Sequence, residues 1–370
     1  MKGPRVKNNR PISIFVFPTH CSKEKTPGVD YCRMILPMRE LQKDPRFKVT
    51  IFDNTLSKKA LSKFDWRDIA QEYDILYINY LTLPWDFAMI GMLFRKYGKK
   101  IVFDIDDLIW EIQKDNSSYE VYKPGSDGRA VITDIVNEVD YVTVTNNYLR
   151  NALISYTKKT YDKVAVMPNR IDLDLYKWKT KPKKKSRVRI GYFGSSSHFN
   201  DLGDKSFSSG LEKLMKEYPN VEVLTVGAML ASFKRKFGAR YFNDFGHQDI
   251  YTWVGLMKDK LKEVDIWAVP LVTSTYNKSK SSIKFLEMSS TGRPGCWQKI
   301  RPYEEVVKHG KNGFLCSGVN SWYSNLKKLV DDKKLRRKMG QEALKTVKDD
   351  WQMSQHVEAY ADLFIKVLTK

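Results

Sequence analysis

The stretch Lys177-Trp178-Lys179-Thr180-Lys181-Pro182-Lys183-Lys184-Lys185 divides the chain into two halves of similar pattern. It is polar, is broken by a proline and contains few residues that could enter a hydrophobic core, as is typical of a linker. An apolar, β-branched run begins directly after it, at 187–193. We therefore expect a basic linker at 177–186 between an N-terminal domain, 1–176, and a C-terminal domain, 187–350.

In both halves, short β-branched runs alternate with longer segments of helical periodicity. This alternation is typical of a parallel sheet with crossover helices. In the first half we expect strands at 12–17, 48–52, 74–79, 100–104, 140–145 and 163–167, and helices at 31–42, 84–97 and 129–138. In the second half we expect strands at 187–193, 221–226 and 265–269, and helices at 207–217, 250–262, 281–291, 321–331 and 334–348. The pattern predicts an α/β protein with two Rossmann-like domains facing a cleft, and a C-terminal helix within 351–370 that packs back on one of them.

The composition favours a globular protein with anionic partners. The 370 residues are 42% hydrophobic, which suits two or three domains. Lys and Arg total 64 against 43 for Asp and Glu, giving a net charge of +21. DNA, RNA, acidic lipid and nucleotide sugars are all compatible with this charge.

The four cysteines are widely spaced and form no Cys-x-x-Cys pair, so we expect neither a disulfide framework nor a zinc site, and we expect a reducing, cytoplasmic location. The apolar run Ile12–Phe17 follows a basic start, as in a signal peptide, but it is short and leads into Pro18-Thr19-His20. We expect it to be the first buried strand. No run reaches the roughly 18 apolar residues of a spanning helix, so any membrane contact is expected to be peripheral.

A second informative stretch is Lys280-Ser281-Ser282-Ile283-Lys284-Phe285-Leu286-Glu287. Ser281 or Ser282 is a candidate N-cap, and Gly292 with Pro294 is expected to end the helix. The free backbone N–H groups and the positive dipole at such a start attract phosphate.

The charges around this helix start suit a nucleotide diphosphate. Lys280 precedes the start, and Lys284 shares a helix face with Glu287 at the i,i+3 spacing. The cations could meet phosphates while the carboxylate accepts from ribose hydroxyls. The alternative is an ordinary surface helix with a Lys–Glu pair.

Several motifs together resemble those of the GT-B glycosyltransferases of the large retaining "group 1" kind. They occur in the family's order and cover most of residues 12–365. The motifs are Pro27–Arg33, Phe103–Asp107, Val166–Asp172, Arg189–Ser195 and Lys280–Gly313.

The resemblance implies that the C-terminal domain holds a nucleoside-diphosphate sugar, with UDP favoured, and that the N-terminal domain holds the acceptor. Glu287 would bind the donor ribose. Independently of the resemblance, His247 in the loop 245–249 is a candidate base or ribose neighbour, or alternatively a satisfied surface or core histidine. The backbone around Gly194 and Ser195, with Lys280 and Lys284, would hold the diphosphate and stabilise charge on the leaving group. Retention of anomeric configuration is implied; no cofactor is expected, and no divalent metal is expected to be essential.

Two positions depart from the family pattern. The family's donor helix carries two glutamates eight positions apart, and the earlier position is Ser279 here. The short strand after Pro294 is usually β-branched, whereas this chain has Trp297 and Gln298. These two side chains either shape the sugar or acceptor pocket or serve in simple packing.

The carboxylate cluster Asp104-Ile105-Asp106-Asp107 ends an apolar strand, where doubly wound domains place ligands. Three interpretations remain open. As a metal-binding Asp-x-Asp, the cluster would indicate a GT-A enzyme using manganese or magnesium. As an acceptor-side cluster, Asp106 or Asp107 would orient or deprotonate a hydroxyl, with Asp104 nearby. In the third, Asp107 caps the next helix and Asp104 pairs with a lysine.

Three further residues follow the first strand and complete the acceptor-side candidates. Gly28 and Arg33 are expected beside the acceptor, and His20 is a catalytic candidate. A lone histidine is, alternatively, a satisfied surface or core residue.

Charge alone suggests what the acceptor is. We favour a hydroxymethylated base in DNA, as in phage enzymes that decorate DNA, because cations are spread over both halves and aromatic residues such as Tyr119 and Tyr122 lie beside Lys123. The alternative is a peripheral enzyme of surface glycan or glycolipid synthesis on an anionic membrane. A nonenzymatic nucleic-acid binder is a third possibility, and the retained Lys280, Lys284 and Glu287 argue against it.

Overall fold

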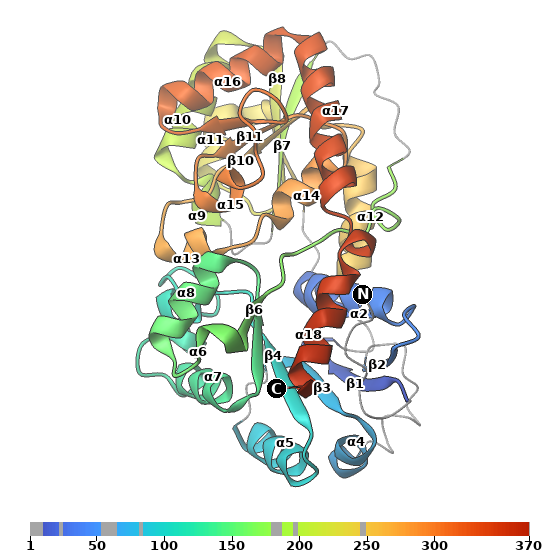
Figure 1. Ribbon diagram of the computed structural model, residues 1–370. Helices are drawn as coiled ribbons and strands as arrows, with labels where there is room; N and C mark the ends of the chain where they lie inside the picture. The colour runs from blue at the N-terminus through green and yellow to red at the C-terminus, as the bar shows by residue number, and fades with distance from the viewer. Residues whose placement is uncertain are drawn as a thin grey trace. The chain divides into compact units, whose positions relative to one another are not determined.

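The computed structural model describes residues 10–21, 25–52, 65–80, 84–178, 187–194, 199–244 and 249–369. The chain forms two compact units (Figure 1). Unit 1 comprises residues 1–114, 118–169 and 353–370, and unit 2 comprises 115–117 and 170–352. Each unit contains one sheet of six strands.

The sheet of unit 1 has the strand order β2-β1-β3-β4-β5-β6, and all its pairings are parallel. Its strands are β1 (Ile12–Phe17), β2 (Phe47–Ile51), β3 (Ile75–Asn79), β4 (Lys100–Asp104), β5 (Tyr141–Val144) and β6 (Val164–Val166). All six predicted strands are confirmed within two residues at each end. The central strand β3 is buried along its whole length, as expected of a sheet covered by helices on both faces.

The helices of unit 1 begin with a continuous helical segment of α1 (Gly28–Asp30), the π-helical turn η1 (Tyr31–Ile35) and α2 (Leu36–Leu41). They continue with α4 (Trp66–Glu72), α5 (Pro84–Lys96), α6 (Tyr119–Tyr122), α7 (Asp127–Glu138) and α8 (Asn147–Tyr156). Short 3-10 turns occupy Ile109–Glu111 and Tyr161–Lys163.

The predicted C-terminal helix is α18 (Val357–Thr369), and it belongs to unit 1. It buries Tyr360, Phe364 and Val367, which share one face at helical spacing. Figure 1 shows α18, in red, beside α2, with which it is in contact.

The sheet of unit 2 has the order β12-β11-β10-β7-β8-β9, again with parallel pairings. Its strands are β7 (Val188–Gly194), β8 (Val221–Gly227), β9 (Tyr241–Asp244), β10 (Ile266–Val269), β11 (Gly295–Gln298) and β12 (Phe314–Cys316). If β7 is counted as the first strand and the sheet is followed from β9 to β12, the order is 3-2-1-4-5-6. This is the strand order of dinucleotide-binding domains. The edge strands β9 and β12 were not predicted.

The helices of unit 2 alternate with these strands. They are α9 (Phe199–Leu202), α10 (Lys205–Glu217), α11 (Ala231–Phe237), α12 (Ile250–Lys260), α13 (Thr275–Ser279), α14 (Ile283–Ser289), α15 (Arg301–Glu304), α16 (Val319–Asp331) and α17 (Lys333–Asp350). Aspartates cap three of the longer ones: Asp204, Asp249 and Asp332 each accept a backbone N–H of the first turn of α10, α12 and α17.

The strand order of each sheet predicts where a ligand binds. The chain runs from β1 outward to β2 and then returns to β3 on the other side, and β7 and β10 are related in the same way. Ligands of such sheets bind outside the carboxyl ends of the strands at this reversal. Within the described ranges, no helix is both long enough and apolar enough to cross a bilayer.

Candidate functional site

In unit 2, the carboxyl end of β7 is occupied by a lysine from α14. Nζ of Lys284 donates to the backbone carbonyl of Phe193 at 3.3 Å and lies 5.4 Å from the ring centroid of Tyr192. A Cβ on Gly194 would lie 2.7 Å from this Nζ and 2.7 Å from the Tyr192 hydroxyl. A side chain at position 194 would therefore displace the Lys284 ammonium or the Tyr192 hydroxyl from its place at the strand end.

The Lys284 ammonium lies in a partly desolvated, charged environment. Burial lowers its pKa to about 8, and Lys280 acts in the same direction, whereas Glu287 and Asp201 oppose the shift. The Tyr192 hydroxyl beside it is buried and has no hydrogen-bond partner within the described part of the chain. Such a hydroxyl costs free energy unless a ligand accepts from it.

Glu287 is held on the next turn of α14. Its Oε1 accepts from the Tyr176 hydroxyl at 2.8 Å, and burial raises its pKa above the ordinary value. Nε1 of Trp178 donates to Ser290 Oγ at 2.9 Å, so the chain preceding residue 179 packs along α14. The rest of the expected linker lies outside the described residues.

The start of α14 lies where it was predicted, but the capping hydrogen bond does not form. The helix begins after Ser282 and ends at Ser289, before the left-handed Gly292. Ser282 occupies the N-cap position, but its side chain makes no capping hydrogen bond; Ser281 is half-buried just before it. The helix has only seven residues, so its dipole contributes little to the binding of a phosphate.

The residues before α14 are fixed by α13. Ser279 is fully buried, and its Oγ donates to the carbonyl of Tyr276 at 2.7 Å, so it does not replace the family's glutamate as a ligand. Nζ of Lys280 lies 4.6 Å from the Tyr276 ring centroid. Lys280, Lys284 and Glu287 are therefore brought together electrostatically, as the spacing predicted.

Trp297 serves in packing. It is fully buried between the rings of Phe285 and Tyr303, and a Cβ on Gly295 or Gly313 would collide with it. Gln298 is nearly buried as well. Ser195 and His247, both expected to bind the donor, lie outside the described residues.

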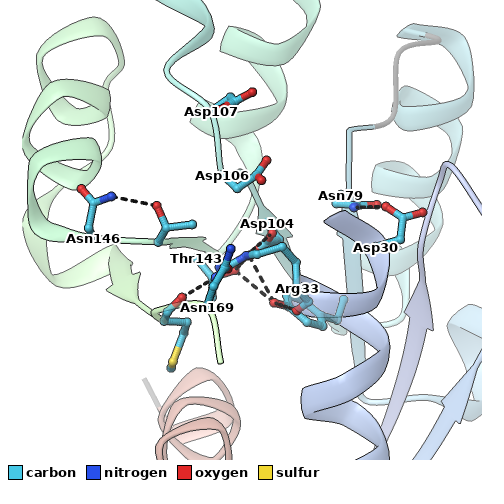
Figure 2. Close-up of polar contacts among 12 residues, drawn as sticks. Asp30, Arg33, Asn79, Asp104, Asp106, Asp107, Thr143, Asn146 and Asn169 are labelled. Atoms are coloured by element: carbon cyan, nitrogen blue, oxygen red, sulfur yellow. Dashed lines mark hydrogen bonds and ion pairs between the residues drawn. The ribbon is translucent and has the colours of Figure 1, made fainter. Parts of the chain in front are cut away.

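In unit 1, Arg33 and Asp104 form a fully buried ion pair (Figure 2). Nε and Nη2 of Arg33 donate to the two carboxylate oxygens at 3.0 and 2.6 Å. Nη1 donates to Oδ1 of Asn169 at 2.9 Å and to the carbonyl of Met167. Thr143 donates to Asp104 at 2.5 Å.

These contacts correct the role expected for the pair. Arg33 and Asp104 were expected beside the acceptor, and Asp104 was alternatively expected to pair with a lysine. Their side chains are both buried and engaged with each other. We therefore assign them a supporting role. The ion pair ties the π-helical turn to β4, and Arg33 also binds Asn169, which follows β6.

His20 lies at the carboxyl end of β1 against a buried carboxylate of α1. Its Nδ1 is 3.2 Å from Oδ1 of Asp30, and this contact raises the pKa of His20. Asn79, at the end of β3, donates to the same oxygen at 2.8 Å, as Figure 2 shows. Gly28, expected on the acceptor side, is the half-buried first residue of α1.

Asp106 and Asp107 follow β4 and are half-buried. Figure 2 shows that both lie farther along the chain than Asp104 and outside the Arg33 ion pair. The Tyr80 hydroxyl donates to Oδ1 of Asp106 at 2.7 Å and accepts the backbone N–H of Asp107 at 3.0 Å. Burial, followed by the charge of Asp107, raises the pKa of Asp106 to about 7.

Within the described residues, no group of three or more His, Cys, Asp or Glu side chains is placed to hold a metal ion. The carboxylate of Asp104 is bound to Arg33, whereas that of Asp106 accepts from Tyr80. The residues cited in favour of a DNA acceptor are also partly engaged, because Tyr122 is buried and Lys123 pairs with Glu120.

Several site residues were not selected from the sequence. They are Asp30, Asn79 and Tyr80 in unit 1, and Tyr176 and Tyr192 in unit 2. Asn79 and Tyr80 end a predicted strand, so the strand-end rule that selected Asp106 would also have found them. Asp30 and Tyr176 carry no such signal, because their partners are distant in the sequence or depend on helix packing.

No family model matches the sequence, and no curated protein matches it. Solved structures match over nearly the full length. Anabaena HepE in complex with UDP-glucose has a TM-score of 0.63 at 14% identity and covers 95% of this chain and 100% of its own. Sucrose-phosphate synthase from Thermosynechococcus elongatus has a TM-score of 0.65 at 13% identity, covering 97% and 99%.

A glycosyltransferase from Rickettsia africae has a TM-score of 0.63 at 12% identity and covers 98% of this chain and 99% of its own. The identities are low, so these similarities establish the architecture alone. The chain has the GT-B fold, as its motifs predicted.

Proposed function

We propose that this protein transfers a sugar from a nucleoside-diphosphate sugar, with UDP as the favoured nucleotide, to an acceptor hydroxyl. The observation that carries the proposal is the arrangement at the end of β7, where Lys284 reaches Gly194 beside the Tyr192 hydroxyl, which has no hydrogen-bond partner among the described residues. A cation and a buried donor at the strand reversal of a dinucleotide-type sheet suit a diphosphate. The fold shared with a UDP-glucose complex supports the same conclusion.

The donor contacts follow from this geometry. Lys284, with Lys280, meets the phosphate oxygens, and the glycine at 194 lets them approach the backbone. Glu287 accepts from the ribose hydroxyls with the oxygen that Tyr176 leaves free. Ser195, by resemblance, and Ser281, Ser282 and His247, by their positions in the sequence, complete the proposed donor site.

The cations accelerate transfer only insofar as they bind the departing diphosphate more tightly than the intact donor. Negative charge grows on the leaving oxygen as its bond to the anomeric carbon breaks, and a lysine in a partly desolvated site stabilises that charge strongly. Retention of configuration and independence of divalent metals are part of the proposal, on the basis of the resemblance.

On the acceptor side, we assign the proton-accepting role to the strand ends of unit 1. His20, Asp106 and Asp107 lie where β1 and β4 end, and His20 and Asp106 are electrostatically close. A group whose pKa lies near the operating pH is suited to accept a proton from a hydroxyl, and Asp106 has a pKa of about 7.

For the acceptor we propose a hydroxymethylated base in DNA, on the basis of the net charge of +21. The test is transfer of labelled sugar from a panel of nucleotide sugars to hydroxymethylated duplex DNA, unmodified duplex DNA and lipid extracts. Label in hydroxymethylated DNA alone is the expected result. Label in lipid alone would overturn the DNA acceptor and favour glycolipid synthesis at a membrane surface.

A further inference from the structure

The two ring nitrogens of His20 differ in their surroundings among the described residues: Nδ1 contacts Asp30, and Nε2 is the candidate proton acceptor. Its Nδ1 lies 3.2 Å from Oδ1 of Asp30, and its backbone N–H donates to Oδ2 of the same residue at 2.9 Å. A carboxylate only accepts hydrogen bonds, so Nδ1 carries the proton. In the neutral ring, Nε2 then presents a lone pair, and the side chain is 44% exposed.

The carboxylate that orients His20 is itself fixed. Asp30 is fully buried, and Nδ2 of Asn79 donates to its Oδ1 at 2.8 Å. Oδ1 of Asn79 accepts the backbone N–H of Thr19 at 2.9 Å. The loop after β1, helix α1 and the end of β3 therefore hold the imidazole together, at the strand reversal of this sheet.

We infer that Asp30 is a positioning residue that fixes His20 so that Nε2 accepts the proton of the acceptor hydroxyl. The inference rests on the proposed sugar transfer. In that step the hydroxyl O–H bond breaks as its oxygen bonds to the anomeric carbon. On the same face of the sugar, so that the configuration is retained, the bond from that carbon to the diphosphate oxygen breaks, and the nucleoside diphosphate leaves with the electron pair. The proton stays on Nε2 until water removes it.

The surroundings of His20 suit this role. The charged groups that act on it are Asp30, Asp106 and Lys25, and its ring lies 5.6 Å from the ring of Tyr80. The hydrogen bond to Asp30 raises the pKa of His20 above 6.5, Asp106 acts in the same direction, and Lys25 opposes them. A raised pKa makes the neutral imidazole a stronger base and stabilises the imidazolium that forms.

The hydrogen bond between His20 and Asp30 is tested first, by NMR and in the absence of substrates. In protein with ¹⁵N-labelled histidine, the signals of His20 are identified by their loss in His20→Gln. We expect a His20 pKa above 6.5, a neutral form protonated on Nδ1, and a lower pKa in Asp30→Asn. A neutral form protonated on Nε2, or a pKa unchanged by Asp30→Asn, would overturn the inference.

The role in transfer is tested by UDP release from UDP-glucose with water as the acceptor, between pH 5 and 9. Wild-type activity should rise with pH as His20 loses its proton. Asp30→Asn should lower kcat by on the order of 10²-fold and shift that rise to lower pH, with UDP affinity unchanged by calorimetry. Added imidazole should restore activity to His20→Ala.

The matched control is Asp140→Asn. Asp140 also accepts a backbone N–H, from Ile101 at 2.8 Å, and also pairs with a cation, Lys100, but at the amino end of the sheet. It should leave the pH profile unchanged. Equal loss of activity in both variants, or no rescue by imidazole, would reduce Asp30 to a structural role. Absence of nucleoside diphosphate release from every nucleotide sugar, with water and with each acceptor of the panel, would overturn the proposed function and the base role with it, whereas the NMR result decides the pairing separately.

Discussion

The Tyr80 hydroxyl lies 2.7 Å from Oδ1 of Asp106 and fixes that carboxyl at the end of β4. Tyr80 has a φ of 34°, in the left-handed region that side-chain-bearing residues seldom adopt. The same hydroxyl accepts the backbone N–H groups of Asp106 and Asp107. The tyrosine therefore holds the start of the loop that carries both carboxylates.

Replacing Asp106 by asparagine should stabilise the protein at pH 8 but not at pH 4. The folded pKa of Asp106 is about 7, above its ordinary value of 3.8. Between these values the unfolded chain has released the proton while the folded chain retains it, so stability falls as pH rises from about 4 to 7. We expect Asp106→Asn to gain on the order of 1–2 kcal/mol at pH 8 in urea unfolding. An equal change in the free energy of unfolding at both pH values would contradict the raised pKa of Asp106.

Replacing Arg33 by methionine should destabilise unit 1 strongly. The change leaves the Asp104 carboxylate buried without its partner, at a cost of about 3–5 kcal/mol in the free energy of unfolding. The control is Arg46→Met, which removes exposed ion pairs to Asp44 and Glu358 and should cost less than about 1 kcal/mol. Urea unfolding measures both variants. Similar losses in the free energy of unfolding would show that the buried ion pair stabilises the protein no more than the exposed ones do.

The affinity for UDP should fall as pH rises from 7.5 to 9. Lys284 has a pKa of about 8, so it is largely cationic at the lower pH and largely neutral at the higher. Calorimetric titration should show an affinity loss of up to about tenfold. In Lys284→Arg the cation persists at both pH values, and the pH dependence should disappear even if the affinity itself is reduced. A wild-type affinity independent of pH would remove Lys284 from the diphosphate site.

Glu287→Ala should weaken nucleotide-sugar binding by about 10- to 100-fold, because hydrogen bonds from ribose hydroxyls to a carboxylate are lost. The measurement is calorimetry with UDP-glucose. Glu304→Ala, at an exposed position on α15, serves as the control and should bind normally. Unchanged affinity in Glu287→Ala would exclude this residue from the donor site.

Transfer should continue at its full rate in EDTA. Asp104, the first carboxylate of the Asp-x-Asp sequence, is bound to Arg33, so it is not available to a metal beside Asp106. Loss of activity in EDTA, with recovery on adding manganese or magnesium, would restore the metal interpretation of the cluster.

The cluster that we propose as the donor site could be assembled largely from the sequence. Lys284 and Glu287 share a helix face because they are three residues apart, and Gly194 ends a recognisable apolar strand. The length of α14 could not be predicted, because serines, threonine and glycine at its ends have weak and competing local preferences. His20, Asp106 and Asp107 were selected because they follow predicted strands. That position alone did not show which of them would accept a proton.

The sequence alone determined the alternation of strands and helices, the division into two α/β halves and the residues of the donor helix, since each depends on short-range periodicity. Only the tertiary structure decided which polar groups meet. Arg33 finds Asp104 across 71 residues, and Asp30 binds His20 through a helix that must first pack beside β1 and β3. The physical reason is that hydrogen bonds between side chains depend on strand order and helix packing, which no local pattern specifies. That arrangement made Asp104 a supporting residue and His20 the proposed base.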